Sequence, residues 1–202
     1  IGNTVLGCGH FEPLRHYAEV HLALSPGKRG SGITFESKCP FDQLDRSYQN
    51  LIRTHVFERE LRGVLIGAPL TDVRVTLLAG KAHEKHTEGG DFREAVYRAL
   101  RQGLMQAESI LLEPWYAFRI QADSRQLGRI LSDIQRLQGV FEPPRQQENR
   151  VTVNGRGPAA GFINYSRELA AFTKGKGMFS FRFDGYEPCQ NQEELAARFS
   201  YD

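Results

Sequence analysis

A strand pattern that leads through a polar loop into a one-sided helix constrains the fold of this chain more than any other segment. Val73, Val75 and Leu77 alternate with polar residues, as in a strand with one buried face. After residue 90 the apolar spacing changes to that of one helix face, at Phe92, Val96, Leu100 and Leu104. Such a helix must bury its apolar row against another layer, so the sequence predicts a fold that combines a sheet with helices.

The loop between this strand and helix is held at both ends and is rich in Lys and His. Asp91 is predicted to cap the helix, because Glu94 follows it at the spacing of a capping box. The loop before the helix contains Lys81, His83, Lys85 and His86. Loops positioned by rigid elements commonly carry binding residues, and these side chains favour a polyanionic partner.

Other elements of the first half are predicted from alternation and turn signals. Residues 15–24 alternate as a half-buried strand, and the turn sequence PGKRGSG follows them. A second strand is predicted over residues 32–36 and is expected to pair with the first. Apolar spacing over residues 44–61 is helical, and Gly63 follows the end of that helix.

The second half begins near Leu112 and Pro114, where proline cannot continue a helix. From there the predicted order is β-α-β-β-α-β, which is the ferredoxin-like order. The predicted elements are a strand over 115–121, a helix over 127–137, a hairpin of 140–142 with 150–154, a helix over 162–172 and a strand over 179–183. The sequence therefore predicts an α+β protein with two domains.

Composition narrows the class of protein. The chain has 202 residues, of which 40% are hydrophobic and 25% are charged, and its net charge is only +2. These values are ordinary for a globular protein and argue against one that coats nucleic acid, although they permit a local basic tip. No apolar run is long enough to cross a bilayer. The chain starts with Ile1 rather than Met, so it is expected to be a fragment or a processed product.

The cysteines indicate a reducing compartment. Cys8, Cys39 and Cys189 are an odd set at wide spacings, which does not fit a disulfide framework. We interpret them as free thiols in a cytoplasmic protein. Cys39 follows Lys38, which could lower the pKa of its thiol, but no pattern ties it to a histidine as in a nucleophilic site.

Two kinds of binding chemistry remain open from the residues alone, metal binding and RNA contact. The sequence contains no GxxxxGK[ST] motif, so a nucleotide site is not indicated. His83 and His86 have HxxH spacing with acidic neighbours, which leaves a metal-dependent enzyme as an alternative. RNA contact is favoured, because basic side chains engage phosphates and histidine rings can stack on unpaired bases. The turn around Lys28 and the loop around Lys85 are expected at the same end of the sheet.

Several segments resemble the C-terminal domains IV and V of elongation factor G and related translational GTPases. They are RGSGITF (29–35), GVLIGAPLTDVRVTLLAG (63–80), LLEP (111–114) and FTKGKGMFSFRFDGYEP (172–188). They occur in the order of the family and at about its spacing. Within the family, GGDFR (89–93), LLEPWYAFRI (111–120) and GYEPC (185–189) are most similar to the ribosomal-protection tetracycline-resistance proteins.

The resemblance implies a domain organisation. Residues 13–112 would form domain IV, which is similar in fold to the second domain of ribosomal protein S5. Residues 113–186 would form domain V, which is ferredoxin-like, in agreement with the order of elements predicted above. Residues 1–12 would be the end of an upstream domain or a linker, and residues 187–202 a C-terminal tail.

The resemblance also implies a partner and a site. Loops at the end of domain IV contact ribosomal RNA in the decoding region of the small subunit, and domain V lies near the factor-binding region of the large subunit. The contact residues carried over to this chain are Lys28, Arg29, Ser31, Lys38, Pro40, Lys81, His83, Lys85, His86 and Thr87. His83 corresponds to a tip histidine that elongation factor G uses in translocation.

The resistance proteins carry Pro and Val near the drug where this sequence has Lys85 and His86. Ribosome binding is thus implied more directly than drug displacement. The expected function is ribosomal protection against tetracycline, and the alternatives are an elongation factor G-type translocation factor and an assembly domain that binds protein partners through the domain V helices. No catalysis, cofactor or metal is expected in this fragment; GTP and Mg²⁺ would be bound by an N-terminal domain of the parent. A cytoplasmic monomer without membrane contact is expected.

Overall fold

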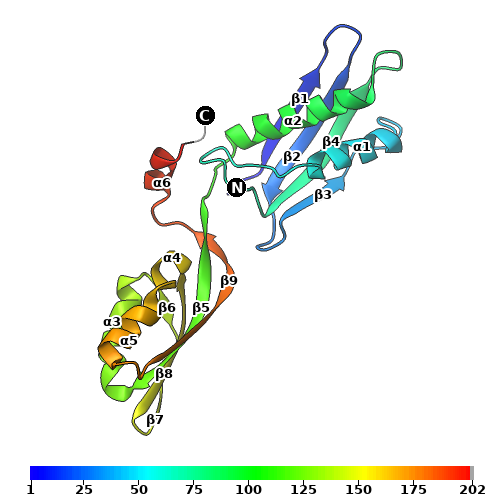
Figure 1. The fold of residues 1–202 in the computed structure, drawn as a ribbon. Helices are drawn as coiled ribbons and strands as arrows, with labels where there is room; N and C mark the ends of the chain where they lie inside the picture. Colours follow the sequence, from blue (N-terminus) through cyan, green and yellow to red (C-terminus); the bar gives the residue numbers. More distant parts are fainter. Residues whose placement is uncertain (201–202) are drawn as a thin grey trace. The chain divides into compact units, whose positions relative to one another are not determined.

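The computed structural model describes residues 1–200, which fold into two compact units. Unit 1 comprises residues 1–111 and the segment that begins at Asn191, and unit 2 comprises residues 112–190 (Figure 1). Both units combine helices with one sheet, so the predicted α+β class is confirmed. Within the described residues, no helix is both long and apolar enough to span a membrane.

Unit 1 contains a four-stranded sheet with strand order β1-β2-β4-β3. Its elements are β1 (Val5–Phe11), β2 (Ala18–Pro26), β3 (Ile33–Ser37), α1 (Arg46–Phe57), β4 (Val73–Ala82), α2 (Gly89–Gln106) and α6 (Gln192–Arg198). β4 lies between β2 and β3, antiparallel to β2 and parallel to β3. The expected pairing of the strand at 32–36 with the strand before it is therefore wrong. Helix α1 supplies the long connection that a parallel pair requires.

The edge strand β1 corrects the expectation for residues 1–12. The resemblance implies that this segment is the end of an upstream domain or a linker, but its residues Val5–Phe11 pair with β2 over seven residues. Gly7 and Gly9 face helix α2, and a Cβ at these positions would lie 2.0 Å from the carbonyl oxygen of Ala99 and 1.7 Å from that of Ala95. Glycine is required there because the helix backbone packs directly on the strand. The same glycines remove the apolar alternation by which a strand is recognised.

The core of unit 1 lies between the sheet and its two helices (Figure 1). Alternate residues of β2 and β4 are buried, and the apolar row predicted for α2 covers them, as Phe92 and Val96 are fully buried and Leu100 and Leu104 nearly so. Tyr48 of α1 packs at 5.1 Å from Phe92 between ring centroids, which joins the two helices. This layer holds the strand ends, and thereby the loops that follow them, in fixed positions.

Unit 2 has the predicted ferredoxin-like topology. Its elements are β5 (Leu112–Asp123), the 3₁₀ turn Ser124–Gln126, α3 (Leu127–Arg136), β6 (Val140–Phe141), β7 (Arg145–Gln147), β8 (Arg150–Pro158), α4 (Ala159–Phe162), α5 (Tyr165–Thr173) and β9 (Met178–Pro188). The strand order is β6-β8-β5-β9, all neighbours are antiparallel, and β7 adds a short pair to β8. The two central strands, β5 and β8, carry the core residues Ile120 and Val153.

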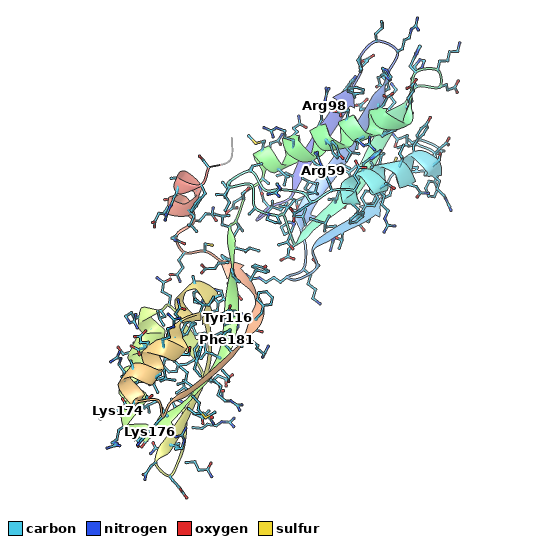
Figure 2. All side chains as sticks on the ribbon, in the orientation of Figure 1. Arg59, Arg98, Tyr116, Lys174, Lys176 and Phe181 are labelled. Atoms are coloured by element: carbon cyan, nitrogen blue, oxygen red, sulfur yellow. The ribbon has the colours of Figure 1, made fainter. Side chains whose placement is uncertain are left out.

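Aromatic side chains extend from this core along the edge strand β9. Phe179 packs against the core, whereas Phe181 and Phe183 are 46% and 54% exposed. Figure 2 shows Phe181 beside Tyr116 of β5, and their rings stack at 4.6 Å. The alternation in β9 thus predicts the strand correctly, although the apolar face is covered by helices over only part of its length.

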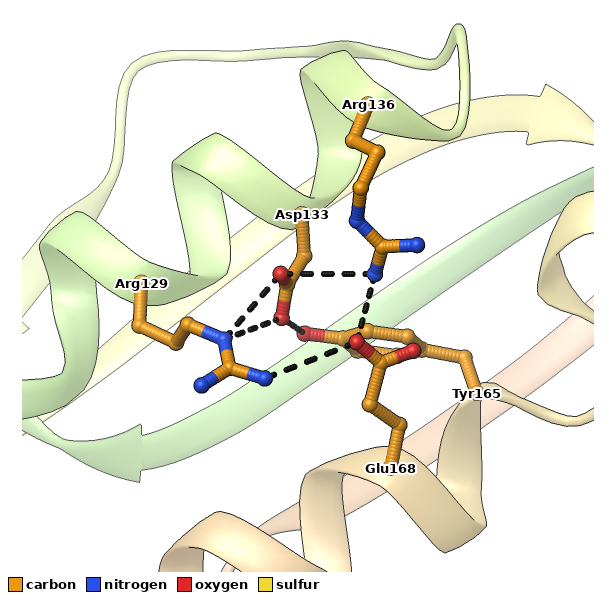
Figure 3. Close-up of polar contacts among 5 residues, drawn as sticks. All are labelled: Arg129, Asp133, Arg136, Tyr165 and Glu168. Atoms are coloured by element: carbon orange, nitrogen blue, oxygen red, sulfur yellow. Dashed lines mark hydrogen bonds and ion pairs between the residues drawn. The ribbon is translucent and has the colours of Figure 1, made fainter.

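A polar network joins the two long helices of unit 2 (Figure 3). Asp133 of α3 is buried and accepts a 2.8 Å hydrogen bond from the hydroxyl of Tyr165 on α5. Arg129 and Arg136 flank the same carboxylate at 3.1 and 3.4 Å and also contact Glu168. A buried carboxylate is stable only when it is paired in this way. Burial and the bond to Asp133 raise the pKa of Tyr165, so it stays a neutral donor.

Candidate functional site

Three loops of unit 1 lie at the same end of its sheet, and we call them the tip: the turn 12–17, the loop 38–45 and the loop 83–88. β3 and β4 are parallel, so the loops that follow them leave from the same end of the sheet. Ala18 at the start of β2 pairs with Ala82 at the end of β4, which brings the β1–β2 turn to this end as well. Figure 1 shows the β1–β2 turn and the β4–α2 loop projecting beyond the sheet.

Thr87 connects two of the tip loops. Its hydroxyl accepts a 2.6 Å hydrogen bond from the backbone N–H of His83 and donates a 2.7 Å bond to the carbonyl oxygen of Tyr17. The backbone N–H of Tyr17 in turn donates a 2.9 Å bond to the carbonyl oxygen of His86. These bonds lock the turn 12–17 to the loop 83–88, so these two loops of the tip form one ordered surface.

The loop 83–88 presents its cationic and histidine side chains to solvent. Lys85, His83 and His86 are exposed, and the two histidine rings stack on each other with centroids 4.6 Å apart. The backbone N–H of Lys85 donates a 3.2 Å bond to Nδ1 of His83, which fixes the orientation of that ring. Lys81, at the end of β4, lies with Nζ 6.0 Å from the ring of Tyr17.

The start of α2 holds the other end of this loop. The N-cap is Glu88 rather than Asp91, and the capping box is formed by Glu88 and Asp91, with a 2.9 Å bond from the Glu88 N–H to the Asp91 side chain. The helix therefore begins three residues earlier than the sequence predicts, because Gly89 and Gly90 form its first turn. Asp91 is buried, and its second oxygen lies 2.9 Å from Nδ1 of His16.

The loop 38–45 is held by one buried glutamine. Gln49 of α1 donates bonds of 2.9 and 3.0 Å to the carbonyl oxygens of Cys39 and Leu44, and its own side-chain oxygen accepts a 2.6 Å bond from Ser37. Lys38 and Pro40, both expected contact residues, are exposed in this loop. Burial raises the pKa of the Cys39 thiol, which does not fit the activated thiolate that its neighbour Lys38 suggested.

The glycine-rich turn lies at the other end of the sheet, which corrects one expectation. Pro26 at the end of β2 pairs with Val73 at the start of β4, because the two strands are antiparallel. Lys28, Arg29 and Ser31 are therefore separated from Lys85 by the length of β4. The expectation that these two loops share one end of the sheet is wrong.

The turn 12–17 takes the place of that glycine-rich turn at the tip. Leu14 is 90% exposed, and Arg15 adopts a left-handed backbone conformation with φ 67°. Sequence reasoning missed this turn because residues 1–12 were not recognised as a strand. Pro13, which interrupts the alternation between two strand-like segments, is the signal that could have located it.

The tip has mixed charge rather than the basic character expected. It carries the cations Arg15, Lys38 and Lys85, with Lys81 at the adjoining end of β4, and the carboxylates Glu12, Asp42, Asp45, Glu84 and Glu88. The carboxylate of Glu88 is engaged in the capping box, and that of Glu12 lies 2.7 Å from Nε2 of His10. Cations are therefore distributed among anions at this end, which favours a small number of specific contacts over a general attraction to polyanions.

In the described residues, the histidine pair is not part of a closely spaced group of three or more potential metal ligands. Within residues 1–200, the one group of three or more His, Cys, Asp and Glu side chains with closely spaced ligand atoms is Cys8, Glu19 and His21. His83 and His86 therefore lack a third ligand, although their rings are in contact. The three cysteines are free, as predicted.

Comparison with known families identifies the two units. Residues 10–108 match the family of elongation factor G domain IV, and residues 110–195 match the family of the elongation factor G C-terminus. The chain belongs to the elongation factor G family. The tip is thus the loop-bearing end of a domain IV, and unit 2 corresponds to the C-terminal domain of elongation factor G.

Two curated relatives show how far the similarity extends. The tetracycline resistance protein TetP of Clostridium perfringens is 29% identical over 184 residues, which cover 91% of this chain and 27% of TetP. Elongation factor G 1 of Synechocystis sp. is 31% identical over 173 residues, which cover 86% of this chain and 25% of that protein. The chain thus spans about a quarter of the length of these relatives.

A solved structure has the same fold. A protein from Thermus thermophilus superposes with a TM-score of 0.84 at 26% sequence identity, over 98% of this chain and 30% of the other. The predicted domain IV and ferredoxin-like folds are therefore confirmed.

Proposed function

We propose that this chain is the ribosome-binding part of a translational GTPase, and that its tip contacts small-subunit ribosomal RNA in the decoding region. The observation that carries the proposal is the ordered tip, in which Thr87 joins two loops at the end of a domain IV. A preformed surface loses little conformational entropy on binding, so a few contacts can give specific affinity.

The tip residues suit RNA in distinct ways. Lys85 and Arg15 are exposed at the apices of their loops and can reach phosphate oxygens. The stacked rings of His83 and His86 offer a flat surface for an unpaired base. Lys38 and Lys81 border this surface. The carboxylates among them disfavour non-specific attachment to any polyanion.

The remaining parts of the activity lie outside the tip. We propose that GTP and Mg²⁺ bind a domain of the whole protein that these residues do not include, since the sequence has no P-loop motif. Unit 2, as a C-terminal domain of elongation factor G, would approach the factor-binding region of the large subunit. The protein would act in the cytoplasm, where ribosomes are.

We favour protection of ribosomes against tetracycline as the outcome of this binding, because TetP aligns over 91% of the chain. Translocation is a second candidate. It is favoured by the similarity to an elongation factor G. The resemblance described above also implies that Lys85 and His86 occupy positions that are Pro and Val in the resistance proteins.

Ribosome binding is tested by co-sedimentation of the full-length protein with ribosomes in the presence of a non-hydrolysable GTP analogue. Lys85→Ala should weaken binding about 10-fold, and Lys28→Ala, which removes the same charge from the opposite end of the sheet, should have little effect. The negative slope of log affinity against log salt should become shallower by about 0.7 to 0.9 in Lys85→Ala, the change expected for loss of one phosphate contact. Equal binding by Lys85→Ala and wild-type protein would contradict the proposal.

The two biological outcomes are separated by in vitro translation with and without tetracycline at fixed GTP. Rescue of translation by the full-length protein indicates ribosomal protection. Support of translation in place of the resident elongation factor, without rescue, indicates translocation. Failure of both, together with no ribosome-stimulated GTP hydrolysis, would refute a translational role.

A further inference from the structure

The outer face of β1 and β2 carries a square of four potential metal ligands. Cys8 and His10 are two residues apart on β1, and Glu19 and His21 are two residues apart on β2. In the register of the two strands, Cys8 is opposite His21 and His10 is opposite Glu19. Directly opposite residues of an antiparallel pair project to the same face of the sheet. The intervening Gly7 and Gly9 face α2, so the four side chains lie on the face away from that helix.

Three of these side chains already bring their ligand atoms together. Sγ of Cys8 lies 3.8 Å from Nε2 of His21, and that nitrogen lies 2.8 Å from Oε1 of Glu19. All three ligand atoms are within 4.8 Å of one another. Tetrahedral zinc with bonds of about 2.3 Å to sulfur and 2.0 Å to nitrogen separates these two ligand atoms by about 3.6 Å. The observed spacing therefore requires only small side-chain rotations.

The surroundings fit the needs of such a site. The second carboxylate oxygen of Glu19 accepts a 3.0 Å hydrogen bond from the hydroxyl of Tyr17, which leaves Oε1 directed at His21. Bonds from outer groups of this kind orient metal ligands in known sites.

We propose that Cys8, Glu19 and His21 bind a zinc ion, and that His10 completes the site as the fourth ligand. A thiolate, imidazoles and a carboxylate form a set that suits Zn²⁺, whereas Mg²⁺ and Ca²⁺ require oxygen ligands. The His10 side chain is 47% exposed and contacts Glu12 at 2.7 Å, so it can turn to the metal without disturbing the core. Zinc binding would release the proton of the Cys8 thiol to solvent.

The site would stabilise the tip. His10 and Glu19 are next to the last pair of the hairpin, Phe11 with Ala18, after which the chain enters the turn 12–17. The metal would therefore tie β1 to β2 immediately before the turn. The hydroxyl of Tyr17 donates a hydrogen bond to Glu19, and the backbone N–H of Tyr17 donates one to the carbonyl oxygen of His86 in the loop 83–88. The proposal is independent of ribosome binding, because it concerns a site on the sheet face.

The test is zinc binding by the purified 202-residue chain after removal of metals with EDTA. Titration with zinc chloride, followed by calorimetry and native mass spectrometry, should give one zinc ion per chain and a higher midpoint of thermal unfolding. Loss of a residue that only orients a ligand costs about 10- to 100-fold in metal affinity. Cys8→Ser and His21→Ala remove direct ligands, so each should lower the zinc affinity by more than this. Cys189→Ser, a matched cysteine of unit 2, should bind zinc like the wild type.

Cobalt substitution provides a readout that does not depend on stability. Co²⁺ in the wild-type chain should show thiolate-to-metal charge-transfer absorption, which is lost in Cys8→Ser and retained in Cys189→Ser. Circular dichroism of each metal-free variant checks that the sheet remains folded. Absence of zinc binding by the stripped wild-type chain, or zinc binding that Cys8→Ser leaves unchanged, would overturn the proposal.

Discussion

The hydroxyl of Thr87 donates a 2.7 Å hydrogen bond to the carbonyl oxygen of Tyr17, across 70 residues of sequence. The same hydroxyl accepts a hydrogen bond from the backbone N–H of His83. One side chain therefore fixes both the shape of the loop 83–88 and its position beside the turn 12–17. Because the tip is ordered through this residue, changes at Thr87 should affect the tip more than the rest of unit 1.

Replacing Thr87 with valine tests this relationship. Thr87→Val keeps the shape of the side chain but removes both hydrogen bonds, which should lower the free energy of unfolding by about 1 kcal/mol. The backbone N–H of His83 loses its acceptor, so its hydrogen exchange should accelerate. Thr54→Val, in which an exposed helix threonine loses a bond to its own helix, is the control. Unchanged protection of His83 in Thr87→Val would show that this bond does not hold the loop.

A second prediction concerns the polar network of unit 2. Tyr165→Phe removes the bond to the buried carboxylate of Asp133 and should cost about 2 kcal/mol of unfolding free energy. Trp115, the one tryptophan of the sequence, lies in unit 2 and reports its unfolding by fluorescence. Tyr116→Phe alters a tyrosine outside this network and should cost less.

The same network predicts a pH dependence. The pKa of Tyr165 is raised in the folded state, so the unfolded chain loses this proton first as pH rises. The stabilisation is complete below the unfolded value of about 10 and is lost above it. Wild-type unit 2 should therefore lose stability as pH increases beyond about 10, and Tyr165→Phe should lose less over the same range. Parallel curves for the two proteins would exclude Tyr165 as the cause.

A third prediction tests the close packing of α2 on β1. Gly9→Ala places a methyl group 1.7 Å from the carbonyl oxygen of Ala95, so strand or helix must move, at a cost of about 1 to 3 kcal/mol. Gly89→Ala introduces the same methyl group where nothing lies within 4 Å and should be neutral or slightly stabilising. Urea unfolding of both variants gives the comparison. Equal stability would mean that the strand can shift freely.

These glycines also explain part of what the sequence could not predict. Alternation over Val151 and Val153 and the stripe through Ile130 and Ile134 correctly predict a ferredoxin-like unit, because its elements are regular and follow one another in space. β1 lacks this pattern, since Gly7 and Gly9 occupy the positions that face the helix. A close approach of two backbones leaves no apolar residue for a pattern to detect.

The error about the glycine-rich turn has a different origin. Local patterns locate β2 and β4 but do not give their relative direction, and the antiparallel pairing of Pro26 with Val73 decides at which end each loop lies. The loop 83–88 was predicted correctly because the strand before it and the helix after it are both strongly patterned. The position of Thr87 between two loops follows only from the folded structure.

The most direct test of the central claim is site-specific photocrosslinking of the full-length protein to ribosomes. A photoreactive p-benzoylphenylalanine replaces Leu14, which is 90% exposed at the tip, or Lys28, which lies at the other end of the sheet. Our account predicts crosslinks to small-subunit ribosomal RNA from position 14 and none from position 28. Crosslinks from position 28 alone, or from neither position when binding is complete, would contradict it.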